Sequence, residues 1–444
     1  MTELTELSIP LPPDPLANLS TEQRYVAERI INCRTPKVFF VTGEAGTGKS
    51  YVLNAVRRAR ACCVCATTAR AALNIGGTTI DRVFNMNRED YSVRNYNSLC
   101  KTMEEIPDLI QIDEASMSGR RMSDLIQDIA CSFNKTLVLY GDLAQASPVK
   151  DDWGTRSSLF QDAEVLRLTE CHRQNDGEYY KALTKLRRGE VTDDVRDLFK
   201  SRVVGYKPLD EEYDKHVRMF ATNKQAAEYN MLRFEGLQNG SPEARFMCEF
   251  VDTRDAYLKN KYPHYDSVIT SAYEGTRLAH DEWMKIGARV LFTVNDKNGS
   301  FVNGDTGEVL DLIIAGNKKL SDVKDGRQIK QSDILTVTIK RDRGNVTLEV
   351  PRQSQEFKDP RGRPNYAMVG FPFRLGWGLT IHKSQGMTLD KAYVDVPSIL
   401  AMPGESRHGL AYVALSRTRE LSGLALTDWN DDAVYCSKEV LDYL

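Results

Sequence analysis

Residues 43–50 decide the fold, and they read Gly43-Glu44-Ala45-Gly46-Thr47-Gly48-Lys49-Ser50. This stretch fits the phosphate-binding pattern G-x-x-x-x-G-K-S/T, in which glycines let backbone N–H groups approach a phosphate. The apolar run 37–42 predicts a buried strand before the loop, and apolar residues at helical spacing predict a helix after it. Together these features predict a nucleoside triphosphate site, and the alternative is a glycine-rich turn that binds nothing.

Side chains of the loop have separate expected roles. Lys49 supplies a positive charge to the phosphates, and the hydroxyl of Ser50 can hold a magnesium ion. We therefore expect the cofactors ATP and Mg²⁺, with the nucleotide contacted by Gly43, Gly46, Thr47, Gly48, Lys49 and Ser50.

Two adjacent carboxylates complete the predicted nucleotide site. Asp113 and Glu114 end the apolar run 109–112, which reads as another buried strand. A carboxylate at a strand end can hold magnesium through its water shell, which is the role expected of Asp113. Glu114 is then placed to orient and deprotonate an attacking water. This pair favours a hydrolase over many kinases with the same loop.

Three further residues are catalytic candidates. Gln145 follows the strand predicted at 136–140, where its amide could sense a γ-phosphate; the alternative is a surface glutamine in a turn. Arg173 and Arg417 each follow an expected strand of a second α/β unit, and a guanidinium that closes on a γ-phosphate has large effects on rate. An isolated arginine is more often simply solvated, but two of them indicate a cleft between two lobes.

Composition is that of an ordinary globular protein. The chain has 444 residues, of which 41% are hydrophobic and 27% charged, and its length favours two or three domains. No apolar run approaches the roughly 20 residues that cross a membrane. The net charge of −3 neither identifies nor excludes a nucleic-acid partner, because a basic groove can lie in an acidic surface. The nine cysteines favour free thiols in a reducing cytoplasm over a zinc site.

Alternation of helix and strand patterns divides the chain. Helical periodicity disappears between about residues 237 and 371, where short apolar runs are separated by Gly, Asn and Asp. We expect an α/β fold: two lobes with parallel sheets, a small inserted antiparallel β-domain and a short excursion from the first sheet. The expected boundaries are a loose tail at 1–17, lobe 1 at 18–150 with its insertion at about 85–107, lobe 2 at 151–239 and 371–444, and the β-rich domain at 240–370.

These motifs, in this order, resemble the superfamily 1 DNA helicases of the Pif/RecD-like group, and the compact size is similar to that of a phage member. The most specific match is Leu375 to Thr388, which contains Thr380-Ile381-His382-Lys383-Ser384-Gln385. The other matching segments are 19–23, 43–50, 66–80, 113–114, 141–149, 170–174 and 412–420. The match is weakest at 85–107 and 240–370.

The resemblance implies that both lobes are RecA-like, that the inserted domain is β-barrel-like and that the excursion in lobe 1 is a short hairpin or wedge insertion. It also implies roles for further residues. Gln23 would read the adenine, and a single DNA strand would be contacted by Thr68, Thr78, Thr79, Thr222, Asn223, Thr380, His382, Lys383 and Ser384. The residues of 380–385 also form a dense polar cluster at a strand-to-helix junction, which suits contacts with backbone phosphates. Tyr91 or Tyr96 could form the strand-separating wedge, although no residue identifies its tip.

The expected activity is that of an ATP-dependent DNA helicase. The resemblance implies 5′→3′ movement on single-stranded DNA and on forked or tailed duplexes, by a cytoplasmic monomer of phage or bacterial origin. One alternative is a translocase that strips proteins or remodels DNA without strong unwinding, since it would share every ATPase residue. A DNA clamp with a decayed ATPase and a metabolic kinase or NTPase are further alternatives, opposed respectively by the intact nucleotide motifs and by 375–388.

Overall fold

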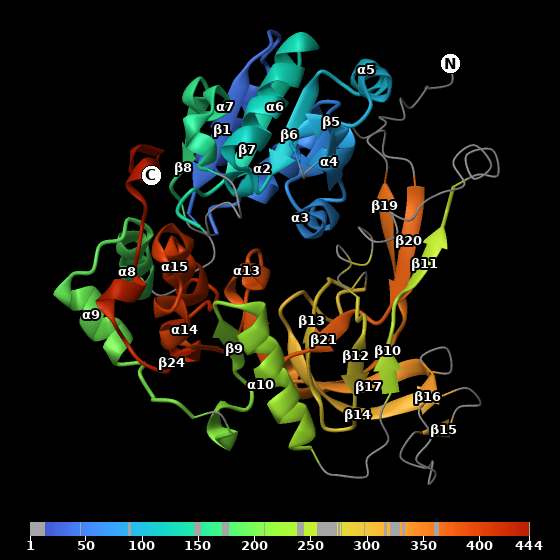
Figure 1. Cartoon of the computed structure of the whole chain (residues 1–444), viewed down its shortest axis with the longest axis vertical. Helices are drawn as coiled ribbons and strands as arrows, with labels where there is room; N and C mark the ends of the chain where they lie inside the picture. The colour runs from blue at the N-terminus through green and yellow to red at the C-terminus, as the bar shows by residue number, and fades with distance from the viewer. Residues whose placement is uncertain are drawn as a thin grey trace, which may run out of the picture.

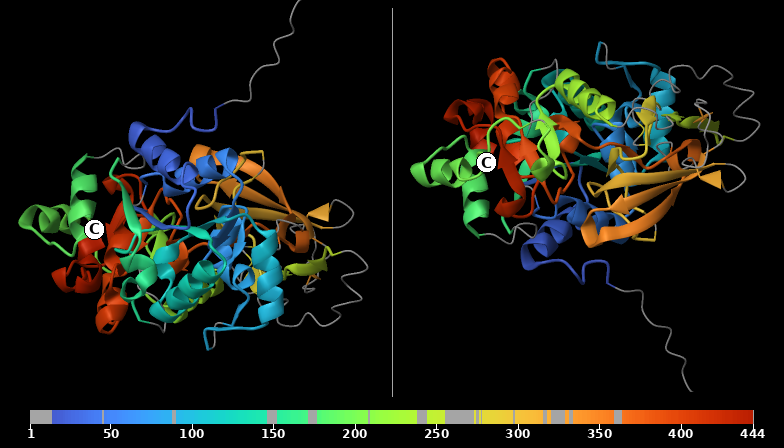
Figure 2. Two further views of the ribbon diagram at one scale, coloured as in Figure 1. Left: turned by 90° about the horizontal axis from the view of Figure 1, so that it is seen from above. Right: turned by 90° about the horizontal axis from the view of Figure 1, so that it is seen from below.

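The computed structural model describes most of the chain. It covers residues 14–443 except for 45, 88–89, 146–151, 171–176, 208, 238–243, 255–272, 274–275, 277, 297, 315–317, 320–328, 331–333 and 359–363. Two α/β lobes and a β-rich domain make up the described chain, with lobe 1 at the top of Figure 1 and the other two side by side below it. The β-rich domain stays beside lobe 2 in both views of Figure 2.

Lobe 1 is built on a six-stranded sheet in which all neighbouring strands are parallel. Its strands lie in the order β3 (Thr78–Thr79), β2 (Cys63–Ala66), β6 (Leu109–Asp113), β7 (Thr136–Gly141), β1 (Val38–Gly43) and β8 (Glu164–Leu168). The strands at the centre are buried along nearly their whole length, which explains why they read as continuous apolar runs.

Helices cover both faces of this sheet. They are α1 (Thr21–Ile31), α2 (Lys49–Ala59) and α3 (Ala69–Asn74) on one face, and α4 (Ile80–Val83), α5 (Tyr96–Glu105), α6 (Arg120–Ser132) and α7 (Ser158–Gln161) on the other. Helix α1 begins at a capping box, in which Ser20 and Gln23 each accept the other's backbone N–H. A hairpin of β4 (Met86–Asn87) and β5 (Ser92–Val93) stands in the insertion expected at 85–107.

Lobe 2 has a smaller parallel sheet. Its strands lie in the order β22 (Gly378–Thr380), β9 (Val217–Phe220), β23 (Ala392–Val394) and β24 (Leu424–Leu426). Its helices are α8 (Gly177–Arg187), α9 (Asp193–Lys200), α10 (Asn223–Glu235), α13 (Ile381–Ser384), α14 (Val396–Leu400) and α15 (Leu410–Leu415). The expected RecA-like α/β architecture with two parallel sheets is therefore confirmed.

The inserted domain is mainly antiparallel. Its main sheet contains β18 (Val346–Pro351), β17 (Ile334–Arg341), β14 (Thr306–Ile314), β13 (Arg289–Phe292) and β21 (Phe373–Leu375), with β15 (Lys318–Lys319) beside β14. A second sheet, of β11 (Glu249–Asp252), β20 (Pro364–Gly370) and β19 (Gln353–Lys358), reaches toward lobe 1 in Figure 1. A third consists of β12 (Glu282–Met284), β10 (Ala244–Phe246) and β16 (Ile329–Lys330).

Two expected boundaries are wrong. Strand β8 lies beyond residue 150, where lobe 2 was expected to begin, but it pairs with β1 and completes the sheet of lobe 1. Strand β21 lies beyond residue 370 but pairs with β13 in the β-rich domain. An apolar run marks a strand but does not say which sheet it joins, because the partner is set by the path of the chain.

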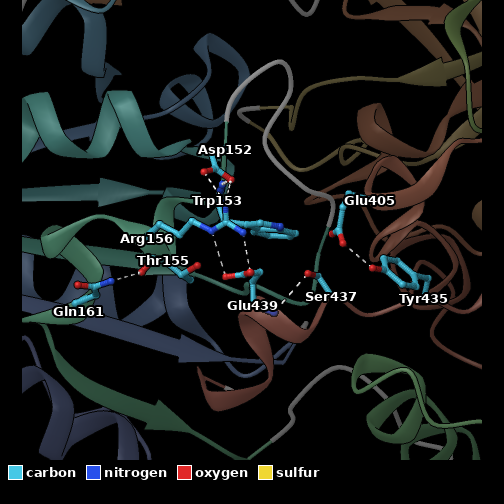
Figure 3. A network of polar contacts seen from close by, with 9 residues as sticks. All are labelled: Asp152, Trp153, Thr155, Arg156, Gln161, Glu405, Tyr435, Ser437 and Glu439. Atoms are coloured by element: carbon cyan, nitrogen blue, oxygen red, sulfur yellow. Dashed lines mark hydrogen bonds and ion pairs between the residues drawn. The ribbon is translucent and has the colours of Figure 1, made fainter.

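The end of the chain returns from lobe 2 to lobe 1. Val440 is fully buried in the lobe 1 core, and the ring of Tyr443 packs edge-on against Phe40 of β1. Figure 3 shows the polar side of this contact, where Arg156 of lobe 1 bridges to Glu439 at 2.7 Å. We call Tyr435 to Tyr443 the C-terminal segment; it joins the two lobes, although it was expected to belong to lobe 2 alone.

Two broader features concern the whole described chain. No helix in these ranges combines the length and the apolar character that a bilayer span requires. Every cysteine in the described part of the chain is a free thiol. The expected tail at 1–17 lies mostly outside the described residues, while Leu16 packs into the core of lobe 1.

Candidate nucleotide and DNA sites

The phosphate loop joins β1 to α2, as the sequence predicts. Gly46 and Gly48 have φ angles of 95° and 85°, a region that side chains rarely adopt. A Cβ on Gly43 would collide with the carbonyl oxygen of Leu168 in β8. The loop thus needs glycine for its conformation and for its close packing, as expected of a backbone that cradles a phosphate.

Lys49 opens helix α2 and turns back into the loop. Its Nζ donates to the carbonyl oxygens of Gly43 at 2.7 Å and Glu44 at 2.9 Å. Burial lowers the pKa of Lys49, and the negative charges of Asp142 and Glu114 oppose this shift. The lysine therefore stands among carboxylates and loop carbonyls, ready to neutralise an added anion.

Gln23 lies directly on this loop. Its side chain is buried, its Oε1 accepts the backbone N–H of Ser20, and its Nε2 donates to the carbonyl of Thr47 at 3.1 Å. The glutamine thus ties α1 to the phosphate loop. Adenine reading by Gln23 stays a prediction.

Asp113 and Glu114 lie at the end of β6, two strands from β1. The Asp113 carboxylate is buried and accepts the backbone N–H of Glu114 at 3.0 Å. Burial and the neighbouring Glu114 raise the pKa of Asp113. Glu114 has left-handed backbone angles, φ 52° and ψ 36°, and strain of this kind clusters at functional sites.

The donor set suits the expected cofactors. Ser50 is exposed on the first turn of α2, and Asp113 ends a strand of the same sheet edge. A hydroxyl and a carboxylate are the hard oxygen ligands that Mg²⁺ prefers. Lys49 and the glycine cradle suit a polyphosphate, so the residues present fit both groups.

The loop after β7 holds Gln145 and a residue that the sequence reasoning passed over. Gln145 is buried, and its backbone N–H donates to the carbonyl of Asp142 at 3.0 Å. Asp142 is fully buried and accepts a hydrogen bond at 3.0 Å from Arg187 of α8, in lobe 2. The signal for Asp142 was a carboxylate ending a run of apolar residues, but its distant partner left no local pattern.

The two arginine candidates have different outcomes. Arg173 lies outside the described residues. Arg417 is buried, and its guanidinium donates to the carbonyl oxygens of Val413 at 2.7 Å and Ser384 at 3.3 Å. It thereby links α15 to the end of α13 inside lobe 2. A catalytic role for either arginine stays a prediction.

Candidate DNA-contacting residues of lobe 1 lie in or just after two neighbouring strands. Thr78 and Thr79 form β3, which pairs with β2, and Thr68 lies two residues after β2. The hydroxyl of Thr68 accepts the backbone N–H of Ala71 at the start of α3, while Thr78 is buried. Because parallel strands end at one edge, Thr68 and Thr79 lie on the edge that also carries the nucleotide motifs.

The lobe 2 candidates also follow neighbouring strands. Phe220 of β9 pairs with Thr380 of β22, so the residues after these strands lie at one sheet edge. Helix α10 begins there with Thr222 as its cap and an exposed Asn223.

Helix α13 presents only part of the predicted polar cluster. Lys383 is exposed and His382 is half-buried, and burial lowers the pKa of this histidine. The hydroxyl of Thr380 caps the helix, while Ser384 is fully buried and donates to the carbonyl of Ile381. Lys383 and His382 are thus the accessible side chains. The hydroxyls of Thr380 and Ser384 instead hold the helix in place.

Helices α3 and α13 face each other between the lobes (Figure 1). A Cβ on Gly386, just after α13, would lie 3.8 Å from the side chain of Asn74 in α3. The end of α13 in lobe 2 therefore lies next to α3 in lobe 1. Nearby, Arg82 of α4 lies over the ring of Tyr366 in β20, 4.8 Å from its centre, so the β-rich domain also contacts lobe 1.

Both wedge candidates lie near the β4–β5 hairpin. Tyr91 is half-buried beneath Arg121, whose guanidinium is 4.5 Å from the ring centre. Tyr96 begins α5 and is 64% exposed, so it is the more accessible ring. Neither observation assigns strand separation to one of them.

Sequence comparisons find proteins similar to this chain. The family model described as an AAA domain matches residues 18–204. The ATP-dependent DNA helicase Pif1 of Bdellovibrio bacteriovorus is 26% identical over 448 aligned residues, covering 96% of this chain and 91% of that protein.

Two solved structures have the same fold. The Pif1 helicase of Candida albicans matches with a TM-score of 0.68 and 25% identity, covering 96% of this chain and 98% of that one. The Pif1 helicase from Bacteroides in complex with ADP-AlF3 and single-stranded DNA matches with a TM-score of 0.58 and 21% identity, covering 96% of each chain. In sequence and in fold, this chain is similar to the DNA helicases named Pif1.

Proposed function

We propose that this protein is an ATP-dependent DNA helicase that moves 5′→3′ along single-stranded DNA and separates duplexes with a single-stranded tail. One observation carries the proposal. The strands that end in the nucleotide motifs, β1, β6 and β7, share a parallel sheet with β2 and β3, and α3, which follows β2, lies next to the end of α13 in lobe 2. One sheet edge thus serves both sites, so a change at the nucleotide can reach the DNA path.

Residues of lobe 1 have distinct roles in this proposal. The backbone of the phosphate loop and Lys49 would hold the phosphates, and Ser50 and Asp113 would hold Mg²⁺, which neutralises phosphate charge when bound. Glu114 would accept the proton of the attacking water. Arg173 and Arg417 would bring positive charge from lobe 2 when the cleft closes.

The DNA strand would lie between the polar edges of the lobes. Lys383, Asn223 and His382 from lobe 2 would contact backbone phosphates opposite Thr68 and Thr79, without reading the sequence. The proposed form is a monomer, because both lobes that complete the sites belong to one chain. The free thiols favour a cytoplasmic location.

A second candidate function is translocation without strong unwinding. The β4–β5 hairpin has only two residues in each strand, and Tyr91 within it is half-buried. Such a protein would displace bound proteins or remodel DNA. This candidate shares the ATPase and differs only in strand separation.

The experiment that tests the proposed ATPase measures hydrolysis with and without single-stranded DNA. Wild type should be stimulated by DNA, and Lys49→Ala should lose hydrolysis because the charge at the phosphates is gone. The matched control is Lys37→Ala, since Lys37 lies before β1 and pairs with Glu164 on the surface. Near-normal DNA-stimulated hydrolysis by Lys49→Ala would show that the phosphate loop is not the site of ATP hydrolysis.

A further inference from the structure

A buried ion pair joins the two lobes beside the nucleotide site. Arg187, the last residue of α8, donates through Nε at 3.1 Å and Nη2 at 3.0 Å to one oxygen of Asp142, at the end of β7. Asp142 is fully buried and the side chain of Arg187 is 6% exposed. A pair removed from water to this degree needs good geometry on both sides to be tolerated.

The rest of the Asp142 carboxylate is also satisfied. Its second oxygen accepts from the hydroxyl of Tyr412 in α15 at 3.2 Å, and its first also accepts the backbone N–H of Ala144. Burial alone would raise the pKa of Asp142, but Arg187 and Lys49 outweigh it and lower that pKa. The carboxylate is therefore charged and is held from lobe 2 by two helices.

Helix α8 contacts the phosphate loop as well. Thr184, one turn before Arg187, donates to the carboxylate of Glu44 at 3.1 Å. The charges of the pair also act on Lys49: after the dominant effect of burial, Asp142 raises the pKa of this lysine and Arg187 lowers it. One face of a lobe 2 helix thus touches both the loop after β1 and the loop after β7.

Lobe 2 also contacts the segment 142–145, which carries Gln145. The backbone N–H of Ser437 donates to Nδ1 of His408, so Nε2 carries the proton and donates to the carbonyl of Leu143 at 2.8 Å. A Cβ on Gly409 would collide with the carbonyl oxygen of Ala144. The segment 142–145 is thus packed against lobe 2 along its length.

We propose that Arg187 is a positioning residue for ATP hydrolysis, acting through Asp142 to hold the segment 142–145, which carries Gln145, in place against lobe 2. This inference rests on the proposed ATPase. The guanidinium does not need to touch the nucleotide, because it fixes the carboxylate on which the loop after β7 turns. Misplacement of a positioned group by about 1 Å can slow a reaction by ~10²-fold.

The competing explanation is that the pair only stabilises the fold. Removing one partner would then unfold the protein by leaving a buried charge unpaired, and activity would fall only in proportion to folding. A pair of neutral amides distinguishes the two explanations. The double variant Asp142→Asn with Arg187→Gln removes both charges together and keeps groups that can hydrogen-bond.

The experiment compares wild type, each single variant and the double variant. For each, we would measure the thermal unfolding midpoint, the affinity for a fluorescent ATP analogue, and kcat and KM of DNA-stimulated hydrolysis. The single variants should have a lower thermal unfolding midpoint than wild type. The midpoint of the double variant should return most of the way to the wild-type value. Its kcat should stay ~10- to 100-fold below wild type while KM changes less, because positioning acts on the reaction rather than on binding.

The matched control is another ion pair between the lobes. Arg156→Gln with Glu439→Gln removes a partly exposed bridge that lies outside the nucleotide site, and its kcat should equal that of wild type. Full recovery of kcat along with the midpoint in the Asp142/Arg187 double variant would overturn the proposal.

A conservative variant covers the case in which the double variant stays unstable. Arg187→Lys keeps the charge but loses the fork that places two N–H groups on one carboxylate oxygen. A reduced kcat with an unchanged affinity for the ATP analogue supports positioning, and a wild-type kcat overturns it. Absence of DNA-stimulated hydrolysis in wild type would instead be a failure of the proposed function itself.

Discussion

At the scale of single residues, Glu114 shows how the fold prepares a chemical group. Its left-handed backbone costs about 1–2 kcal/mol for a residue with a side chain. Bonds on both sides hold it there: its N–H donates to Asp113, and its carbonyl accepts the hydroxyl of Thr67 from the end of β2. The strain is thus maintained by two neighbouring strands.

Glu114→Gln should bind ATP and DNA but hydrolyse ATP about 10²–10⁴-fold more slowly, because the amide keeps the shape and loses the base. Nucleotide affinity and single-turnover hydrolysis would be measured on the same preparation. Glu28→Gln, a surface substitution on α1, should match wild type in both. Loss of nucleotide binding in Glu114→Gln would instead make Glu114 structural.

Gly409→Ala should destabilise the protein by more than about 1 kcal/mol, because the position has φ 69° and no room for a Cβ beside the Gln145 loop. Chemical denaturation would measure the change. Gly205→Ala is the control, since its φ is 82° and no atom lies within 4 Å of the added carbon. Equal losses for both variants would mean that backbone strain alone matters and that the packing on the loop contributes nothing.

At the scale of elements, strands were more predictable than their partners. The runs at 109–112 and 136–140 became β6 and β7 because buried parallel strands are apolar along their whole length. Strand β8 was expected in the wrong lobe, and the bond from Arg187 to Asp142 spans 45 residues of chain and two lobes. Residue types and local spacing carry no record of such contacts.

The polar cluster at 380–384 illustrates the same limit within one helix. Its residues were predicted to contact DNA. Which of the hydroxyls form hydrogen bonds within the helix instead depends on the three-dimensional structure. His382→Ala should therefore weaken binding to single-stranded DNA while leaving DNA-independent hydrolysis largely unchanged. Titrations of a labelled oligonucleotide at two salt concentrations would measure this, since phosphate contacts make affinity depend strongly on salt. Equal affinities would place His382 away from the DNA path.

The C-terminal segment is predicted to stabilise the pairing of the lobes. Val440→Ala should cost about 2 kcal/mol of unfolding free energy, because two buried methyl groups leave the lobe 1 core. Leu441→Ala changes a neighbour that is 42% exposed and should cost less than about 0.5 kcal/mol. Denaturant unfolding of both variants would make the comparison, and equal costs would contradict the burial of Val440.

At the scale of the whole molecule, the lobes are joined on one side and meet as polar edges on the other. The Asp142–Arg187 pair and the C-terminal segment form the joints, while α3 and α13 face each other where the DNA strand would lie. Opening and closing about the Asp142–Arg187 pair would change the spacing of the polar edges. ATP hydrolysis and the grip on DNA are thereby coupled in our account.

The most direct test of that account is strand separation on matched duplexes that carry either a 5′ or a 3′ single-stranded tail. With ATP and Mg²⁺, wild type should separate the 5′-tailed duplex and leave the 3′-tailed duplex largely intact, and Lys49→Ala should separate neither. Separation of the 3′-tailed duplex alone would contradict the polarity. DNA-stimulated hydrolysis without separation of either duplex would contradict the helicase assignment and favour the translocase.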